Sequence, residues 1–269
     1  MAKLKMLAES YYIPKNETGD DATFFSQSAQ VIGVADGVGG WSTEGIDAGE
    51  YARQLMRNAY AAAVKEYRHR PIFQVDPKEV LRHAFLNTAE MGSSTACIIS
   101  FAAAPVGKMI LRAANVGDSG FMVIRGGGTV YRSPVQQHSF NFPYQLEYSS
   151  EKHSHRQAAE LAVEVESGDV VVAGTDGLFD NLFAGDIERI VGDYCMDSMF
   201  SLSETLARAA HGRSRETTTV SPFQVAANEA GIRYVGGKLD DITVVVAYVV
   251  PDTSSSYGGG DGDVMDVDC

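Results

Sequence analysis

Three apolar runs of this chain each end in an aspartate that is flanked by glycine. The runs cover residues 31–36, 113–118 and 170–176, and they deliver Asp36, Asp118 and Asp176. Aspartate is unfavourable within strands, and glycine is the residue of sharp turns. Three buried strands with a carboxylate at each tip are therefore expected to bring these carboxylates together around hard cations. Three unrelated Asp-Gly turns are the alternative, which explains a single run better than it explains all three.

The overall charge narrows the range of partners. The 269 residues carry a formal net charge of −13, and the sequence pI is about 4.8. Nucleic acid and anionic membrane surfaces would be repelled, so neither is expected as a partner. An acidic protein that handles phosphate groups needs metal ions to reverse the local field, and this agrees with a metal site built from carboxylates.

The cysteines and the apolar runs bear on the compartment. Cys97, Cys195 and Cys269 are odd in number and lack Cys-x-x-Cys spacing, which predicts a reducing compartment without a disulfide framework or zinc ribbon. No apolar run approaches the roughly 18 residues of a membrane helix, so no membrane insertion is expected. Residues 1–7 are basic but too short for a targeting signal. We expect a cytosolic or nuclear protein, or a chloroplast or mitochondrial one if a transit peptide is missing.

Strand-like and helix-like periods alternate along the chain. Strands are expected at residues 23–26, 30–35, 95–101, 109–116, 121–125, 129–132, 161–166, 170–173 and 242–250. Helices are expected at residues 47–68, 77–90, 184–196, 202–212 and 222–230. Most strand links are short enough for hairpins, so the sheets should be mainly antiparallel. Helix pairs separate the sets of strands, which predicts a layered α/β or α+β domain.

Two other segments lack a regular period. Residues 133–155 are polar and aromatic, and we expect a surface loop there. Residues 251–269 are rich in serine, glycine and aspartate, and we expect a disordered acidic tail.

Further carboxylates adjoin the predicted strands. Asp20 and Asp21 precede the strand at residues 23–26, Asp240 and Asp241 precede the strand at 242–250, and Asp180 follows Asp176 by four residues. Ligand sets made only of oxygen favour Mg²⁺ or Mn²⁺ over zinc. Two such ions a few ångströms apart can hold a phosphate group and activate a water at neutral pH.

Other catalytic motifs fail in their context. The Gly-Asp-Ser-Gly run at residues 117–120 resembles a serine-protease nucleophile loop, but no disulfide framework accompanies it. A cysteine phosphatase needs an arginine six residues after its nucleophile, and neither Cys97 nor Cys195 has one. The Gly-Gly-Lys run ending at Lys238 lacks the flanking residues of a Walker loop, and the histidines show no zinc-binding helix pattern.

Six ordered motifs resemble those of the type 2C metal-dependent protein serine/threonine phosphatases. They are GDDA at 19–22, VADGVGG at 34–40, GSSTA at 92–96, NVGDSG at 115–120, GTDGLFD at 174–180 and DDITV at 240–244. Their details are similar to the compact branch that includes plant organellar members and the T-cell activation phosphatase. The resemblance implies one phosphatase domain at residues 4–250, of the α+β class, folded as a four-layer αββα sandwich of two mainly antiparallel sheets.

The resemblance also implies a binuclear Mg²⁺ or Mn²⁺ centre at the strand tips. Asp36 would bridge both ions, and the Gly37 carbonyl would bind one of them. Asp176 and Asp240 would complete the shell of the other ion. Asp20 stands where many members have glutamate, so its shorter side chain would bind through water.

The remaining acidic residues receive lesser roles from the resemblance. Asp118 and Asp180 match a third, weaker metal site. Asp21 and Asp241 are expected to form hydrogen bonds rather than to ligate directly, although the choice between Asp240 and Asp241 as direct ligand stays open.

Two departures from the family pattern concern the phosphate and the leaving group. Many members carry a phosphate-binding arginine where this chain has Asn16, with Lys15 beside it. Many also have histidine after the metal-binding Asp-Gly, where this chain has Val38. Phosphate clamping and protonation of the leaving group therefore lack their usual residues.

The implied activity is metal-dependent hydrolysis of phosphoserine and phosphothreonine in proteins by an activated water. The expected partner is a phosphoprotein, and the expected state is a monomer. The alternatives are a catalytically impaired, phosphatase-like binding module and a phosphatase of small phosphate esters.

Overall fold

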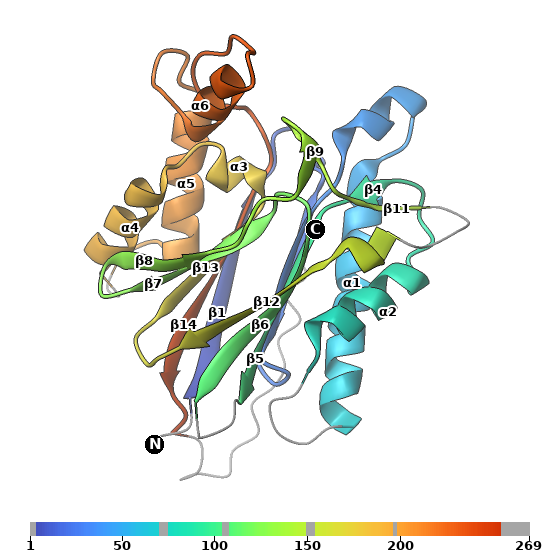
Figure 1. Ribbon diagram of the computed structural model, residues 1–269, viewed down its shortest axis with the longest axis vertical. Helices are drawn as coiled ribbons and strands as arrows, with labels where there is room; N and C mark the ends of the chain where they lie inside the picture. The colour runs from blue at the N-terminus through green and yellow to red at the C-terminus, as the bar shows by residue number, and fades with distance from the viewer. Residues whose placement is uncertain (1–3, 70–74, 104–107, 149–153, 196–197, 254–269) are drawn as a thin grey trace.

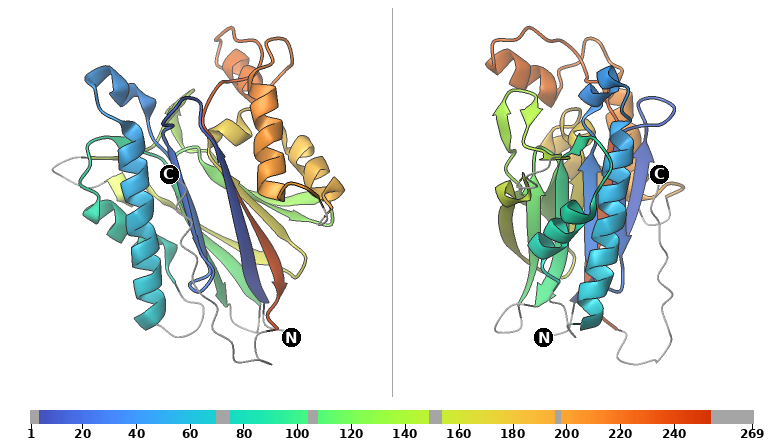
Figure 2. Two further views of the ribbon diagram at one scale, coloured as in Figure 1. Left: turned by 180° about the vertical axis from the view of Figure 1, so that it is seen from behind. Right: turned by 90° about the vertical axis from the view of Figure 1, so that its right-hand side faces the viewer.

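Two sheets lie face to face in this computed structural model, and helices cover the outer side of each sheet (Figure 1). The structure describes residues 4–69, 75–103, 108–148, 154–195 and 198–253. The view from behind shows the same layers, with helices on the two outer sides and the sheets between them (Figure 2). The predicted α+β class with two mainly antiparallel sheets is confirmed, since all strand pairs within the two large sheets are antiparallel.

Each large sheet has five strands. The first sheet has the order β1 (Leu4–Ile13), β14 (Ile242–Pro251), β13 (Val170–Gly174), β7 (Gly120–Arg125) and β8 (Gly128–Arg132). The second sheet has the order β12 (Ala159–Val165), β6 (Met109–Val116), β5 (Ala96–Ala103), β3 (Val31–Asp36) and β2 (Asp21–Ser26).

Helices cover the sheets from both sides. On the second sheet lie α1 (Ala48–His69) and α2 (Pro77–Asn87). On the first sheet lie α3 (Asp176–Phe179), α4 (Ala184–Asp193) and α5 (Leu202–Ser214), while α6 (Pro222–Glu229) stands at one end. Short 3₁₀ helices are η1 (Gly39–Glu44) and η3 (Ser154–Gln157). No helix in the described part of the chain is long and apolar enough to span a bilayer.

The alternation of side chains along a strand explains the layers. In β3, Ile32 and Val34 point into the core between the two sheets, whereas Val31 and Ala35 pack under α1. All four are at most 1% exposed. Strands that are apolar on both faces can lie between another sheet and a helix layer, and that is the position of β3. Burying each of the valine and isoleucine side chains contributes roughly 1.5–3 kcal/mol.

The structure adds one long strand that the sequence did not predict. β1 pairs with β14 along its whole length, from Leu4 opposite Pro251 to Ile13 opposite Ile242. Its apolar residues do not alternate regularly with polar ones, and only Met6 is fully buried. The pairing with a strand at the far end of the chain creates β1.

The expected loop at residues 133–155 is partly strand. It contains β9 (Gln137–Ser139), β10 (Phe142–Pro143) and β11 (Leu146–Glu147), and β11 pairs with β4 (Ser93–Ser94). Its residues 149–153, and most of the predicted tail, 254–269, lie outside the described residues. The other predicted helices and strands are present with ends shifted by a few residues.

Candidate metal centre

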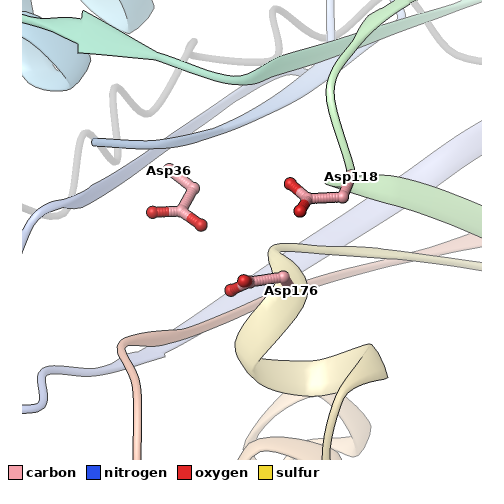
Figure 3. A group of neighbouring side chains, drawn as sticks. All are labelled: Asp36, Asp118 and Asp176. Atoms are coloured by element: carbon pink, nitrogen blue, oxygen red, sulfur yellow. The ribbon is translucent and has the colours of Figure 1, made fainter. Parts of the chain in front are cut away.

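The strand tips at one end of the sandwich bring three carboxylates together. Asp36 is the last residue of β3, Asp118 lies between β6 and β7, and Asp176 begins α3 directly after β13. One oxygen of each carboxylate lies within 4.8 Å of the other two. The three side chains point toward a common centre (Figure 3). Segments far apart in sequence thus form one oxygen-lined site.

Close backbone contacts explain the glycines that follow the first and third aspartates. A Cβ atom on Gly37 would lie 2.5 Å from the carbonyl oxygen of Asp20. A Cβ atom on Gly177 would lie 1.9 Å from the carbonyl oxygen of Asp241. Both distances are shorter than real contacts, so any larger residue would force the neighbouring segments apart. The glycines allow the acidic segments to meet.

A lysine reaches a second set of carboxylates beside this group. The Lys15 ammonium lies 3.0 Å from Asp20 Oδ2, 3.0 Å from Asp241 Oδ2 and 3.3 Å from Asp240 Oδ1. Asn16, at the position of the family arginine, contributes no positive charge. Its side-chain oxygen accepts hydrogen bonds from the backbone N–H groups of residues 18 and 19 and shapes the loop. Lys15 supplies the positive charge instead.

A second lysine lies among another set. The Lys238 ammonium forms an ion pair with Asp176 and lies 2.8 Å from Asp180 Oδ2 and 3.0 Å from Asp240 Oδ2. Asp240 therefore places one carboxylate oxygen on each lysine. The acidic end of the sandwich consequently holds two cationic positions that share one carboxylate.

A buried hydrogen-bond layer supports these residues. Asp21 pairs with Asp36 in the register of β2 and β3. Its Oδ2 atom accepts hydrogen bonds of 2.8 Å from the hydroxyls of Thr175 and Thr243. Thr175 directly precedes Asp176, and Thr243 lies near the start of β14. Both belong to the first sheet or its extension, whereas Asp21 belongs to the second, so the layer ties the two sheets together at the site.

Asp241 makes a similar connection on the other side of the site. Its Oδ1 atom accepts hydrogen bonds of 2.9 Å from the Tyr12 hydroxyl and from the backbone N–H of Lys15. Its Oδ2 atom accepts a 3.2 Å hydrogen bond from the backbone N–H of Asp20. Asp241 thus fixes the loop that bears Lys15 and Asp20.

Burial and neighbouring charges shift the pKa values of the carboxyl groups at the site. Burial, together with Asp176 and Asp180, raises the pKa of Asp118 to about 8. Burial also raises the pKa of Asp180 to about 7, although Lys238 opposes the shift. Burial and then the adjacent Asp176 raise the pKa of Asp36 well above its ordinary value. Burial would raise the pKa of Asp176 too, but Lys238, a hydrogen bond with Asp36 and the charge of Lys15 together lower it.

Unpaired oxygens at the centre fit a cation. Asp118 Oδ1 and Asp176 Oδ1 are buried and have no hydrogen-bond partner. A buried carboxylate oxygen without a partner is unfavourable, and a hard divalent ion is the group that such oxygens bind best. The donor set contains no imidazole or thiolate, which fits Mg²⁺ or Mn²⁺ rather than zinc.

The structure places all of the predicted site residues at this end of the sandwich. Asp36, Asp118 and Asp176 form the central group. The other four surround it: Asp20, Gly37, Asp180 and Asp240. Their role as metal ligands stays a prediction. Lys238 was not predicted as a site residue, because its Gly-Gly-Lys run was considered only as a Walker loop and lacks the flanking residues of one. Its spacing from Asp240 was the available signal, since residues two apart in an extended segment share a face.

The sequence matches the family model of protein phosphatase 2C over residues 11–212. It is 47% identical over 252 residues to the probable protein phosphatase 2C 55 of Arabidopsis thaliana, covering 91% of this chain and 52% of that protein. It is 37% identical over 263 residues to the protein phosphatase PTC7 homolog fig of Drosophila mojavensis, covering 90% of this chain and 82% of the relative. The chain spans about half the length of the first relative.

Solved structures give the same result. The photosystem II phosphatase PBCP superposes with a TM-score of 0.79 at 30% identity, over 90% of this chain and 98% of that one. The catalytic domain of the serine/threonine phosphatase PstP, solved with two manganese ions, superposes with a TM-score of 0.56 at 17% identity, over 92% and 100% of the two chains. The latter likeness concerns the fold alone. Together with the family match, these findings confirm the predicted resemblance, and the chain belongs to the protein phosphatase 2C family.

Proposed function

We propose that this chain is a metal-dependent phosphatase that removes phosphate from phosphoserine and phosphothreonine in proteins. One observation carries the proposal. Asp36, Asp118 and Asp176 arrive from three separate strands with oxygens within 4.8 Å of one another, and two of these residues keep a buried oxygen without a partner. Such a group is costly unless cations neutralise it. The monomeric state and the compartment stay predictions.

The residues divide into ligands and supports. Asp36, the Gly37 carbonyl, Asp20, Asp176 and Asp240 would hold two Mg²⁺ or Mn²⁺ ions, with Asp118 and Asp180 available for a third and weaker one. When bound, the ions neutralise phosphate charge and activate water for in-line attack on phosphorus. Asp21 and Asp241 hold the ligand-bearing loops in place through their hydrogen bonds.

Lys15 is the side chain we propose for the substrate phosphate. Its side chain is 27% exposed, against 15% for Lys238, so it is the more accessible cation of the site. It replaces the missing arginine in charge, although an ammonium group cannot form the paired hydrogen bonds of a guanidinium. Replacing it with methionine should raise KM for phosphorylated substrates more than it lowers kcat.

A protein substrate is favoured over a small ester by the surroundings of the site. Leu239 lies between Lys238 and Asp240 and is 66% exposed. Val235, on the same connection, is 56% exposed. Exposed apolar side chains next to a charged site offer contacts to a polypeptide that a small ester cannot use. We therefore assign the phosphorylated protein as substrate class.

One observation favours a second candidate. Lysine ammonium groups already neutralise part of the carboxylate cluster, as expected for a phosphatase-like binding module that works without metal. The two functions differ in turnover. The metal-dependent phosphatase hydrolyses a phosphothreonine peptide with Mn²⁺ and stops when the metal is chelated. A binding module retains the peptide without hydrolysing it under either condition.

The assay uses a phosphothreonine peptide, a phosphoserine peptide and p-nitrophenyl phosphate, each with Mn²⁺, with Mg²⁺ and with a chelator. Metal-dependent turnover with higher kcat/KM for the peptides supports the proposal. Turnover confined to p-nitrophenyl phosphate would assign the protein to small esters. Full activity after exhaustive chelation would reject the metal-dependent chemistry altogether.

A further inference from the structure

One buried amide holds the backbone of Lys238 against the turn that carries two of the aspartates. Asn181 Oδ1 accepts a 3.0 Å hydrogen bond from the Lys238 backbone N–H. Asn181 Nδ2 donates to the carbonyl of Lys238 at 2.9 Å and to that of Gly177 at 2.9 Å. Asn181 is 1% exposed, and it follows Asp180 directly. The position of Lys238 is thus fixed relative to the α3 turn.

The side chain of Lys238 then turns inward to the carboxylates. Its ammonium contacts Asp176, Asp180 and Asp240 together, and its side chain is 15% exposed. Phe223 of α6 lies on its other side, with the ammonium 5.1 Å from the ring centroid. The ammonium group therefore lies between an aromatic face and three carboxylates, and it supplies one positive charge to them without any added ion.

Two of these three carboxylates are the ones assigned above to a single metal ion. An ammonium group and a divalent ion cannot occupy the same position among the same oxygens, since their charges repel and their radii overlap. We propose that Lys238 is an internal competitor of this metal: its ammonium must withdraw from Asp176 and Asp240 before the ion can bind. The inference rests on the proposed metal centre and adds to it a residue that sets metal affinity.

The competition has a predictable sign. If the site is open to metal only in the fraction of molecules whose Lys238 has withdrawn, the apparent affinity is reduced by that fraction. Removing the ammonium makes the site open in all molecules, so metal binds more tightly. The same change removes the ammonium that Asp176 and Asp180 contact and leaves Asp240 with Lys15 alone, so the metal-depleted protein becomes less stable. Tighter metal binding and lower metal-free stability are expected together.

The test compares the wild type with Lys238→Met, which keeps the length of the side chain and removes its charge. The matched control is Lys108→Met, since Lys108 is an exposed lysine that pairs with Glu164 on β12. Mn²⁺ affinity is measured by titration calorimetry on metal-depleted protein, and the melting temperature is measured with a chelator and with saturating Mn²⁺. Lys238→Met should bind Mn²⁺ roughly tenfold or more tightly than the wild type. It should melt lower in chelator, and Mn²⁺ should narrow the difference.

Different outcomes separate this inference from the proposed function. Equal or weaker Mn²⁺ binding by Lys238→Met, with the wild type binding normally, overturns the competition and leaves the metal centre standing. A wild type that binds no Mn²⁺ overturns both. Lys108→Met should match the wild type in affinity and melting temperature, and a shift as large as that of Lys238→Met would make the effect one of net charge, which also overturns the competition.

A measurement on the unchanged protein guards against a variant that fails to fold. An amine-acylating reagent is applied with chelator and with saturating Mn²⁺, and modification of Lys238 is quantified by mass spectrometry. An ammonium held among carboxylates is protected, and an ammonium displaced by metal reacts faster. Increased modification of Lys238 with Mn²⁺, at constant modification of Lys108, supports displacement. Equal protection of Lys238 under both conditions contradicts it.

Discussion

The space between the two sheets is filled differently at its middle and at its end. In the middle, Ile99, Val123 and Val245 are each 0% exposed and pack across from strand to strand. At the end, the same strands or their extensions place carboxylates and two lysines within ion-pair distance of one another. β3 contains both kinds of filling, with Ile32 and Val34 followed by Asp36.

The difference separates stability from chemistry. Apolar side chains in the middle lower the free energy of the fold through burial. Carboxylates crowded at the end raise it unless cations are present, because like charges and buried oxygens are unfavourable. The strands thus support a site that is itself destabilising. Substitutions at the two places should consequently have opposite patterns of effect.

The largest effect is expected from Asp36→Asn. Loss of one central carboxylate should lower kcat by roughly 1,000-fold. The melting temperature in chelator should stay unchanged or rise, because a like charge has been removed from the cluster. Asp193→Asn, at the exposed end of α4, is the control and should leave kcat unchanged. Near-normal turnover of Asp36→Asn, measured on a phosphothreonine peptide, would reduce Asp36 to a turn residue.

In the middle of the sandwich, Leu111→Ala should show the reverse pattern. Leu111 is 0% exposed in the core between the sheets. Its truncation should lower the free energy of unfolding by about 2–5 kcal/mol, because a cavity is left behind. The kcat of the folded protein should stay within about twofold of that of the wild type. Urea unfolding and active-fraction assays check both, and a large loss of kcat would mean that middle and end are coupled.

The pH dependence of stability sharpens the comparison further. The pKa values of Asp118 and Asp180 are raised to about 8 and about 7 in the folded protein, above roughly 3.9 for an unfolded aspartate. A raised carboxyl pKa stabilises the fold fully below the unfolded value, and this stabilisation is lost as the pH rises through the folded value. In chelator, the melting temperature should therefore fall as the pH is raised from 5 to 8.

The net negative charge of the chain also lowers stability at high pH, so a variant is needed to isolate the site. Asp118→Asn should flatten the decline between pH 6 and 8, and saturating Mn²⁺ should do the same in the wild type. A decline that is identical in Asp118→Asn and the wild type would show that Asp118 does not hold a proton in this range.

The smallest effect is expected at Val38. A departing serine alkoxide is strongly basic and benefits from a proton donor, which valine is not. Val38→His should speed alkyl phosphate hydrolysis selectively and flatten the dependence of log kcat/KM on the pKa of the leaving group. Val130→His, on exposed β8, serves as control. Identical slopes for Val38→His and the wild type would remove position 38 from the protonation step.

The convergence of the aspartates at the strand tips could be predicted because the sequence signal for each tip is local. Asp36 with Gly37, and Asp176 with Gly177, join a strand to a turn within a few residues, and both glycines are required by backbone contacts that adjoin the site. The alternating apolar pattern predicted most strands and helices for the same reason.

The parts that could not be predicted depend on distant contacts. β1 is a strand because it pairs with β14 at the other end of the chain, and its own apolar residues do not alternate regularly with polar ones. Lys238 gains its importance only where Asn181 fixes its backbone and the α3 turn brings Asp176 and Asp180 to its ammonium. No local pattern contains these contacts.

The most direct test of the metal centre is the number of Mn²⁺ ions that each chain binds. Metal-depleted wild type and Asp36→Asn are titrated with Mn²⁺ at pH 7.5 by calorimetry, with bound metal counted by atomic emission after dialysis. The account predicts two ions for the wild type, with any third much weaker, and a loss of affinity at both positions in Asp36→Asn, because one bridging carboxylate serves both. Equal stoichiometry and affinity in the two proteins, or no bound Mn²⁺ in the wild type, would contradict it.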